Sequence, residues 1–358
     1  MSKKYKVIIT PMEPYTLGTE QGSKYEGVQN NGRESYIIGS SEVPEQTTIL
    51  GTLRYIVLLN KGILKSNFKY DQSDYETISN LIGKSSFSFE AVEQSFGIIE
   101  EISPIFIQQK INDREVKIFV RNPFCNKSKY EYSPYQLETE ETLTSRGNIK
   151  LPGQDYDVKK GFGRGYICIQ DKKVIDDLFV KKIVSGNKKD NTNDNKKEGF
   201  YKREMILFNP NYDGIFSFGV YVKAEENAFP DSCIAYMGRK KSAFRFEFEI
   251  VDDNETIENA VEEAFATNNS DEVWYYALSD LYVPEFEYYD SFAIILNKTI
   301  RNLETNVCGN SYTSKRSKSK KINLISEGSV FKEMPYINEN NCKKAGYNSI
   351  VKLGGNSK

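Results

Sequence analysis

Residues 43–55 constrain the fold more than any other segment, because they join an extended turn directly to an apolar helix. Pro44 disfavours the helical conformation at Val43, so the chain enters this segment extended. Apolar side chains then recur with the period of a helix that buries one face. They are Ile49, Leu50, Leu53, Ile56 and Val57. The pattern predicts a helix that begins near Thr47 and packs on a sheet, with Gly62 as its C-cap.

The start of this helix also carries groups suited to phosphate. Thr47 and Thr48 have hydroxyls that can cap the free N–H groups of a helix N-terminus, a position that favours anions. Gly51 permits close backbone approach, and Arg54, one turn further on, has a forked guanidinium that matches phosphate oxygens. An ordinary capped core helix explains the same residues, so both interpretations stay open on this segment alone.

The chain of 358 residues contains no histidine. This removes the usual general acid or base at neutral pH and the commonest transition-metal ligand, and so excludes Ser-His-Asp triads, HExxH zinc sites and histidine-assisted nucleases. The five cysteines are scattered and show no Cys-x-x-Cys spacing, so we expect reduced, structural thiols. We therefore expect a protein with no catalytic residues, no metal site and no cofactor.

The formal net charge of −2 shows that any nucleic-acid site must come from local clusters of Lys and Arg. The 24 tyrosines and 21 phenylalanines include rings on which bases could stack, although most aromatics in a strand-rich protein are core. No apolar run approaches the roughly 20 residues that span a bilayer, and the Met-Ser-Lys-Lys start lacks the apolar stretch of a secretory signal. We expect a soluble, cytoplasmic protein.

Short β-type runs bounded by turn residues dominate the rest of the chain. Residues 4–10 predict a first strand, residues 73–82 a second helix, and residues 98–108 with 115–121 a hairpin around Asn112 and Asp113. Further strands are predicted at residues 166–170, 205–208, 215–222, 232–237, 244–251 and 322–331, and a short acidic helix at residues 256–265. Residues 18–41 are expected to form a glycine-rich, polar loop.

Three polar stretches separate the predicted strands and helices. Residues 130–160 are poorly patterned and too long for an ordinary connection, so we expect an arm or insertion. Residues 185–199 have nothing to bury and predict a mobile loop, and residues 311–321 form the most basic loop of the chain. The sequence predicts two α+β domains of similar size, residues 1–160 and residues 161–358.

Two segments combine glycine with cations. Residues 160–163 read Lys-Gly-Phe-Gly, the first four positions of an RNA-recognition signature, but Arg164 and Gly165 replace the Phe-Val that should follow. A glycine-rich strand entry and a backbone-contacting RNA loop both fit. Residues 237–241 read Met-Gly-Arg-Lys-Lys between two predicted strands, which is typical of a solvated hairpin turn or of a phosphate-tracking loop.

Other motifs recur in a fixed order. Residues 10–14 read Thr-Pro-Met-Glu-Pro, residues 327–331 read Glu-Gly-Ser-Val-Phe, and residues 346–348 read Gly-Tyr-Asn. Taken in order with residues 44–54, these segments resemble the RAMP superfamily of CRISPR-associated proteins. The resemblance is greatest to the Cmr-type subunit of type III-B effector complexes, which caps the 5′ end of the guide RNA.

The match to that family extends over nearly the whole chain. Residues 44–54 resemble its proline, hydroxyl and Gly-x-Leu-Arg helix motif, and residues 163–169 with 198–208 its "Gly-strand, then Phe-Tyr-x-x-Glu" pair. Residues 327–331 resemble its Ala-Gly-Ser-Val-Tyr signature. The chain departs from the family at Glu13, which replaces the usual acid, and at residues 237–239, which have one glycine fewer than its Leu-Gly-Gly-type loop.

The resemblance implies an α+β fold of two ferredoxin-like, RRM-type domains with glycine-rich loops and inserted arms or hairpins. It also implies a non-catalytic, crRNA-binding subunit that holds the repeat-derived 5′ handle of the crRNA. Such a subunit would dock on the large polymerase/nuclease-like subunit and on the first RAMP backbone subunit of the filament. The arm at residues 130–160 would be a thumb-like element that separates handle from guide.

The residues that we expect to contact RNA are Thr47, Thr48, Gly51, Arg54, Lys159, Lys160, Gly161, Gly163, Arg164, Gly238, Arg239, Lys240, Lys241, Arg316 and Lys318. One alternative is a metal-independent RAMP endoribonuclease that processes CRISPR precursor RNA, with Tyr166 or Tyr347 acting beside Lys160. Another is a structural scaffold that never touches RNA.

Overall fold

A computed structural model describes fifteen stretches of the chain. They are residues 1–19, 23–29, 33–65, 72–134, 139–145, 147–152, 163–188, 199–238, 241–266, 273–283, 293–301, 303–304, 317–318, 320–337 and 341–354. The predicted α+β class is confirmed, with mostly antiparallel sheets and few helices. The described helices are α1 (Gln46–Asn60), α2 (Gln72–Ile82), α3 (Ile257–Phe265) and α4 (Asn341–Lys344). Within these stretches no helix is long and apolar enough to cross a membrane.

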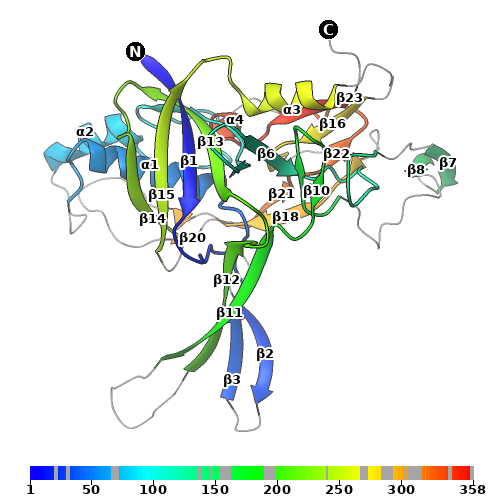
Figure 1. Cartoon of the computed structure of the whole chain (residues 1–358), viewed down its shortest axis with the longest axis horizontal. Helices are drawn as coiled ribbons and strands as arrows, with labels where there is room; N and C mark the ends of the chain where they lie inside the picture. The colour runs from blue at the N-terminus through cyan, green and yellow to red at the C-terminus, as the bar shows by residue number, and fades with distance from the viewer. Residues whose placement is uncertain are drawn as a thin grey trace.

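One large antiparallel sheet organises the body of the molecule (Figure 1). Its strands are β1 (Ser2–Pro11), β4 (Ile99–Ile102), β5 (Phe106–Lys110), β6 (Val116–Arg121), β9 (Tyr166–Cys168), β10 (Val174–Ile175), β13 (Ile215–Glu225), β14 (Ser232–Met237) and β15 (Ser242–Val251). Their order is β10-β9-β6-β5-β13-β1-β15-β14, and β4 also pairs with β13. The predicted hairpins β5–β6 and β14–β15 are both present.

The register of this sheet places one apolar residue from each of five neighbouring strands in a row. Ile9 pairs with Phe218 on one side and with Phe246 on the other. The row continues from Phe218 through Ile107 to Phe119, and each of these five side chains is at most 2% exposed. Because side chains alternate between the two faces of a strand, the shared face fixes the register of all five strands.

Both faces of the sheet are covered, but by different layers. The helix α1 buries Ile49, Leu53 and Ile56 in the same cluster as the row described above. On the opposite face, Phe106 and Tyr221 cluster with α3 and with the strand β16 (Val273–Ala277). The central sheet therefore separates two apolar cores.

A second, smaller sheet covers part of that opposite face. It contains β16, β17 (Ala293–Ile294), β22 (Val330–Phe331) and β23 (Ile350–Gly354). Two further short ladders pair separately, β18 (Asn297–Ile300) with β21 (Ile322–Ile325) and β19 (Leu303–Glu304) with β20 (Ser317–Lys318). Trp274 and Tyr276 of β16 are almost fully buried, so this sheet closes the second core.

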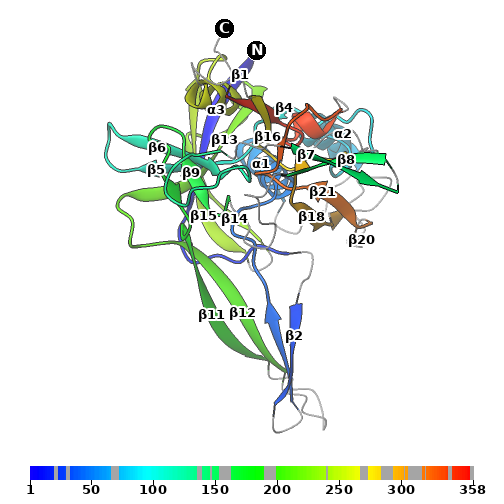
Figure 2. The ribbon, with the colours of Figure 1, turned by 90° about the vertical axis from the view of Figure 1, so that its right-hand side faces the viewer.

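A four-stranded arm projects from the body, as Figures 1 and 2 both show. Its strands are β2 (Ser23–Gln29), β3 (Arg33–Ile38), β11 (Phe179–Lys188) and β12 (Gly199–Phe208), in the order β11-β12-β3-β2. The pairing of β12 with β3 is parallel, whereas the other two pairs are antiparallel. Two hairpins from distant parts of the chain therefore build this arm.

The strands of the four-stranded arm differ from two predictions. Residues 18–41 contain the hairpin β2–β3 and are not only a loop, and residues 185–188 extend strand β11 where a mobile loop was expected. Within the predicted arm at residues 130–160, the described residues include a small hairpin, β7 (Thr139–Thr144) with β8 (Gly147–Pro152). Residues 189–198 lie outside the described residues.

The predicted boundary at residue 160 does not separate two sheets. Strand β1, from the first half, lies between β13 and β15 of the second half. The arm likewise combines β3 with β12. The two halves therefore share both of these sheets, and a pair of ferredoxin-like domains stays a prediction.

Replacing Ile9 by Ala should test the role of the apolar row. We expect the free energy of unfolding to fall by about 2–5 kcal/mol, because Ile9 is fully buried between two phenylalanines and its truncation leaves a cavity. The neighbouring Ile8, on the other face and only partly buried, is the matched control, and its replacement by Ala should cost less than about 1.5 kcal/mol. Urea denaturation measures both, and equal losses would contradict the assignment.

Candidate functional site

The first turn of α1 differs from the sequence prediction. Glu45 is the N-cap, its side chain makes no capping hydrogen bond, and Thr47 and Thr48 already lie inside the helix. The carbonyl oxygen of Glu45 accepts hydrogen bonds from the backbone N–H groups of Thr48 (2.8 Å) and Ile49 (3.1 Å). The two threonines therefore do not cap the helix, and the side chain of Glu45 is free to point elsewhere.

Arg54 also differs from its expected role. Its Nη1 donates to the carbonyl oxygen of Ser85 (3.1 Å), and its guanidinium lies 5.4 Å from the centre of the Phe96 ring. Burial lowers the pKa of Arg54 to about 10, and its Nε and Nη2 atoms are buried without a hydrogen-bond partner. In this conformation the guanidinium faces the protein interior and is not offered to a phosphate. Gly51, by contrast, is exposed.

Three glycines of the predicted motifs pack around residues 121–124. Gly163 lies against the backbone of Pro123 and Phe124, and Gly328 lies against the side chain of Arg121. The carbonyl oxygens of Gly165 and Gly328 accept hydrogen bonds from the N–H groups of Asn122 (3.0 Å) and Phe124 (2.8 Å). These glycines thus join segments of the fold that are far apart in sequence.

Arg164 lies between two of those glycines, and it is exposed. Its carbonyl oxygen accepts a hydrogen bond from Asn122 Nδ2 (3.0 Å), which fixes the backbone of this loop. The loop therefore presents one cation to solvent from a backbone that is held rigidly.

The turn between β14 and β15 is anchored in the same way. Gly238 has a φ of +77° and packs directly against the carbonyl oxygen of Thr16. The N–H of Thr16 donates to Ser242 Oγ (3.2 Å), and its hydroxyl donates to the carbonyl oxygen of Glu204 in arm strand β12 (3.0 Å). Lys241, at the other end of the turn, is exposed. This basic turn therefore lies beside the root of the arm.

Several predicted RNA contacts cannot be placed. Lys159, Lys160, Gly161, Arg239, Lys240 and Arg316 lie outside the described residues. Lys318 is described only as a backbone position in β20.

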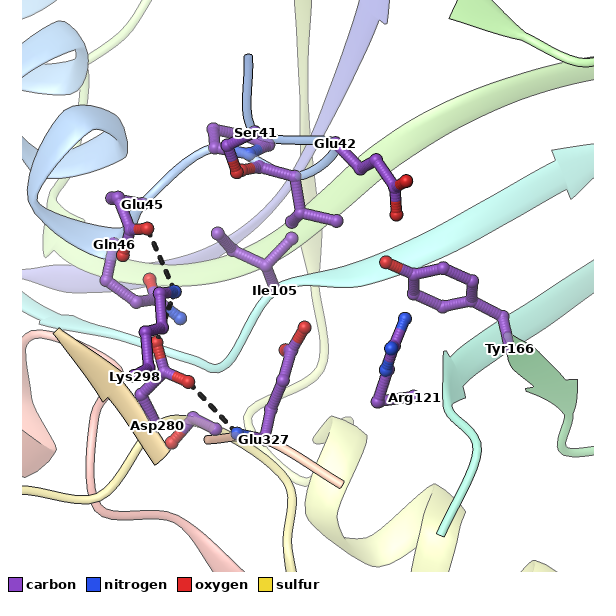
Figure 3. Close-up of a pocket in the computed structure, with 13 residues that line it drawn as sticks. Ser41, Glu42, Glu45, Gln46, Ile105, Arg121, Tyr166, Asp280, Lys298 and Glu327 are labelled. Atoms are coloured by element: carbon purple, nitrogen blue, oxygen red, sulfur yellow. Dashed lines mark hydrogen bonds and ion pairs between the residues drawn. The ribbon is translucent and has the colours of Figure 1, made fainter. Parts of the chain in front are cut away.

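The structure also shows a cavity that the sequence did not predict (Figure 3). It has a volume of about 160 Å³ and lies between the segment that precedes α1 and the second half of the chain. Its lining residues are Ser41, Glu42, Val43, Pro44, Glu45, Gln46, Ile105, Arg121, Tyr166, Ser279, Asp280, Lys298 and Glu327. The Pro-Glu-Gln of the helix motif thus meets the first residue of the Glu-Gly-Ser-Val-Phe motif.

Lys298 links two walls of this cavity. Its Nζ lies 2.9 Å from Glu45 Oε1 and 2.7 Å from Asp280 Oδ2. Although burial alone would lower the pKa of Lys298, the charges of Asp280 and Glu45 raise it well above its ordinary value. The lysine is therefore a half-buried cation that forms ion pairs with two carboxylates.

Arg121 and Glu327 form the opposite side of the cavity. The guanidinium of Arg121 lies 5.2 Å from the centre of the Tyr166 ring. Burial, with the nearby charge of Asp280, raises the pKa of the Glu327 carboxyl to about 7. The backbone N–H of Glu327 donates to Asp280 Oδ1 (2.9 Å), which holds this loop in place.

The charges of the lining suit positive groups better than phosphate. Four carboxylates face two cations, and both cations already have acidic or aromatic neighbours. Among the described residues no cluster of three or more acidic or cysteine side chains has the arrangement of a metal site. Sequence reasoning missed this cavity because its charged residues lie up to 285 positions apart and share no motif.

No protein-family model and no curated protein matches the chain. Among solved structures, it is similar to a chain of the type III-B Cmr-beta complex bound to cognate target RNA, with 15% identity over 98% of both chains and a TM-score of 0.46. In the same complex bound to cognate target RNA and AMPPnP, a chain matches with 14% identity over 96% of this chain and 95% of that one, with a TM-score of 0.44.

A chain of the Csm3-Csm4 subcomplex of the type III-A CRISPR-Cas interference complex also matches. The identity is 12% over 99% of this chain and 100% of that one, with a TM-score of 0.35. The chain is thus similar to subunits of the class of complex that its ordered motifs resemble.

Replacing Gly238 by Ala should lower the free energy of unfolding by at least about 1–2 kcal/mol, because Gly238 has a positive φ and a Cβ would overlap the oxygen of Thr16. Gly51 is the matched control. It lies inside α1 with open space around it, so its replacement by Ala should raise the stability by about 0.5–1 kcal/mol. Urea denaturation compares them, and a neutral Gly238→Ala would show that the turn is not held against Thr16.

The raised pKa of Glu327 predicts a pH-dependent stability. The folded chain keeps a proton on Glu327 up to about pH 7, whereas an unfolded chain releases it near the ordinary Glu pKa of about 4.3. The stabilisation relative to Glu327→Gln should therefore be complete below the unfolded pKa and disappear as the pH rises through about 7. Urea denaturation of both proteins across this range measures it, and a constant difference would contradict the raised pKa.

Proposed function

We propose that this chain is a non-catalytic subunit of a type III CRISPR effector complex and that it binds the repeat-derived 5′ handle of the crRNA. The observation that carries the proposal is that the motif-bearing segments meet at one end of the main sheet. Gly238 packs on Thr16, Leu17 N–H donates to Ser40 Oγ (2.9 Å), and the next residues, 41–46, line the cavity with Glu327. Arg121 then connects this cavity to the glycines around residues 121–124.

The basic turn at residues 238–241 and the exposed Arg164 are the phosphate contacts of this proposal. Gly238 and Arg164 each have a backbone that close packing or a hydrogen bond holds in place, and cations on such loops can follow a single-stranded backbone at little entropic cost. Tyr236, the last residue but one of β14, is 59% exposed and adjoins this turn, so a base can stack on its ring. The acidic cavity repels phosphates, and the RNA backbone therefore passes over the turn and not into the cavity.

The arm is the proposed docking element for the neighbouring subunits. Its outer strands, β2 and β11, each pair on one side only within the described residues, so their other edges can add a strand. Ile183 and Val184 of β11 are 59% and 42% exposed and would be covered by a partner. We assign this role to contacts with the RAMP backbone subunit and the large subunit.

The environments of Tyr166 and Tyr347, either of which the endoribonuclease alternative would use, do not favour catalysis. Tyr347 is fully buried, with its ring stacked on that of Phe87. Tyr166 is 5% exposed, and burial raises its pKa above the ordinary value, which makes it a poor base at neutral pH. We therefore favour binding over cleavage.

Reversing the charges of Lys240 and Lys241 to Glu should weaken the binding of single-stranded RNA with a repeat-derived 5′ end by about 10-fold or more at about 0.1 M salt. Fluorescence anisotropy with the full chain measures this affinity. The matched control is Lys61→Glu with Lys223→Glu, which removes the same charge at the opposite end of the sheet, where Asn60 bonds to residue 227 and β13 pairs with the start of β1. The control should retain at least half of the wild-type affinity.

If both double variants lose the same affinity for RNA, the binding is non-specific charge attraction. Unchanged affinity in the turn variant would favour the scaffold that never touches RNA. Cleavage of the same RNA by the purified chain without metal would favour the endoribonuclease.

A further inference from the structure

The RNA proposal leaves the acidic cavity without a role. Glu42 enters the cavity from the segment before α1, and Glu327 enters from the opposite wall (Figure 3). Their carboxylates end in the space that the hydroxyl of Tyr166 and the guanidinium of Arg121 border. A ligand in this space would therefore meet acceptors from two sides.

Glu42 and Glu327 share one cation, because the charge of Arg121 acts on both of them. Glu45 and Asp280 likewise share the single charge of Lys298. The Glu42 carboxylate also forms a long ion pair to Lys181 (3.7 Å) on the arm, and the hydrogen bond described for Glu327 involves its backbone N–H and not its carboxylate. The four acids of the lining outnumber its two cations by two, and the excess negative charge is complete only above the Glu327 pKa of about 7.

Gln46 provides an independent acceptor in the same cavity. Its side chain is 94% buried, since the residue is only 6% exposed, and its Nε2 donates to the carbonyl oxygens of Ser103 (3.2 Å) and Gly346 (3.2 Å). Those two bonds fix the amide, and its Oε1 is left buried without a donor. A buried acceptor without a donor costs free energy, and a hydrogen-bond donor in the cavity would remove that cost.

We propose that this cavity is a binding site for one organic cation, a guanidinium or a primary ammonium group, held between Glu42 and Glu327. The volume of about 160 Å³ fits such a group with part of its carbon chain, because a cavity of similar size holds a benzene ring. Guanidinium and ammonium groups carry only donors, which matches the carboxylates of Glu42 and Glu327 and the amide oxygen of Gln46, and the two carboxylates offset the repulsion by Arg121. A lysine or arginine side chain of another subunit and a free polyamine have this chemistry in common.

The probe for the test is agmatine, which carries a guanidinium at one end and an ammonium at the other. We expect saturable one-to-one binding to the full chain by calorimetry at about pH 8, where Glu327 is ionised. Glu327→Gln and Glu42→Gln should each weaken binding by about 10-fold or more, because each removes a charged acceptor. Glu249→Gln, which changes an exposed carboxylate on β15, should bind like the wild type.

The two sources of the cation give different results in the assembled complex. If a neighbouring subunit supplies the side chain, agmatine binds the free chain but not the complex, whereas a site for free polyamine binds agmatine in both. The proposal is overturned if the free chain shows no saturable binding of agmatine. It is also overturned if a folded Glu42→Gln or Glu327→Gln variant binds agmatine as tightly as the wild type. RNA affinity is measured separately, so this site can fail without the RNA proposal failing.

Discussion

The pairing of β1 with β13 and β15 is the interaction on which the rest of the structure depends. It places a strand from the first ten residues in the middle of a sheet whose neighbours lie more than 200 positions away. The apolar row through Ile9 fixes that register, and α1 and α3 then cover opposite faces. Thr16 lies five residues beyond the end of β1, so the same pairing brings the basic turn, the arm root and the cavity to one end of the sheet.

Local pattern was sufficient for much of this fold. The helix α1 was predicted because its apolar period and its flanking Pro44 and Gly62 are local signals, and β14 and β15 because their runs are bounded by the Gly238 turn. The arm was missed because its strands mix polar and apolar residues on both faces and because β3 and β12 pair across more than 150 positions. The cavity was missed for a related reason, since only the tertiary fold brings Glu42, Asp280 and Glu327 together.

The glycine motifs illustrate how one sequence feature can have two physical causes. Gly163, Gly165, Gly238 and Gly328 all have positive φ and all pack against other parts of the chain. Their spacing in the sequence therefore reflects close packing first, and Arg164, beside Gly163, reaches solvent from a loop that this packing holds in place. Arg54 shows the reverse case, a cation whose helical position looked suited to phosphate but whose neighbours bury it.

The interleaving of early and late strands also has a consequence for synthesis on the ribosome. When residue 200 leaves the exit tunnel, β1 has neither of its sheet neighbours and β3 has only β2, because their partners are among the next fifty residues. Until those residues are synthesised, the strand edges and apolar side chains of the first half therefore remain exposed. Cooperative collapse follows only once β15 emerges, which makes this chain a natural client for chaperones that shield unpaired strands during translation.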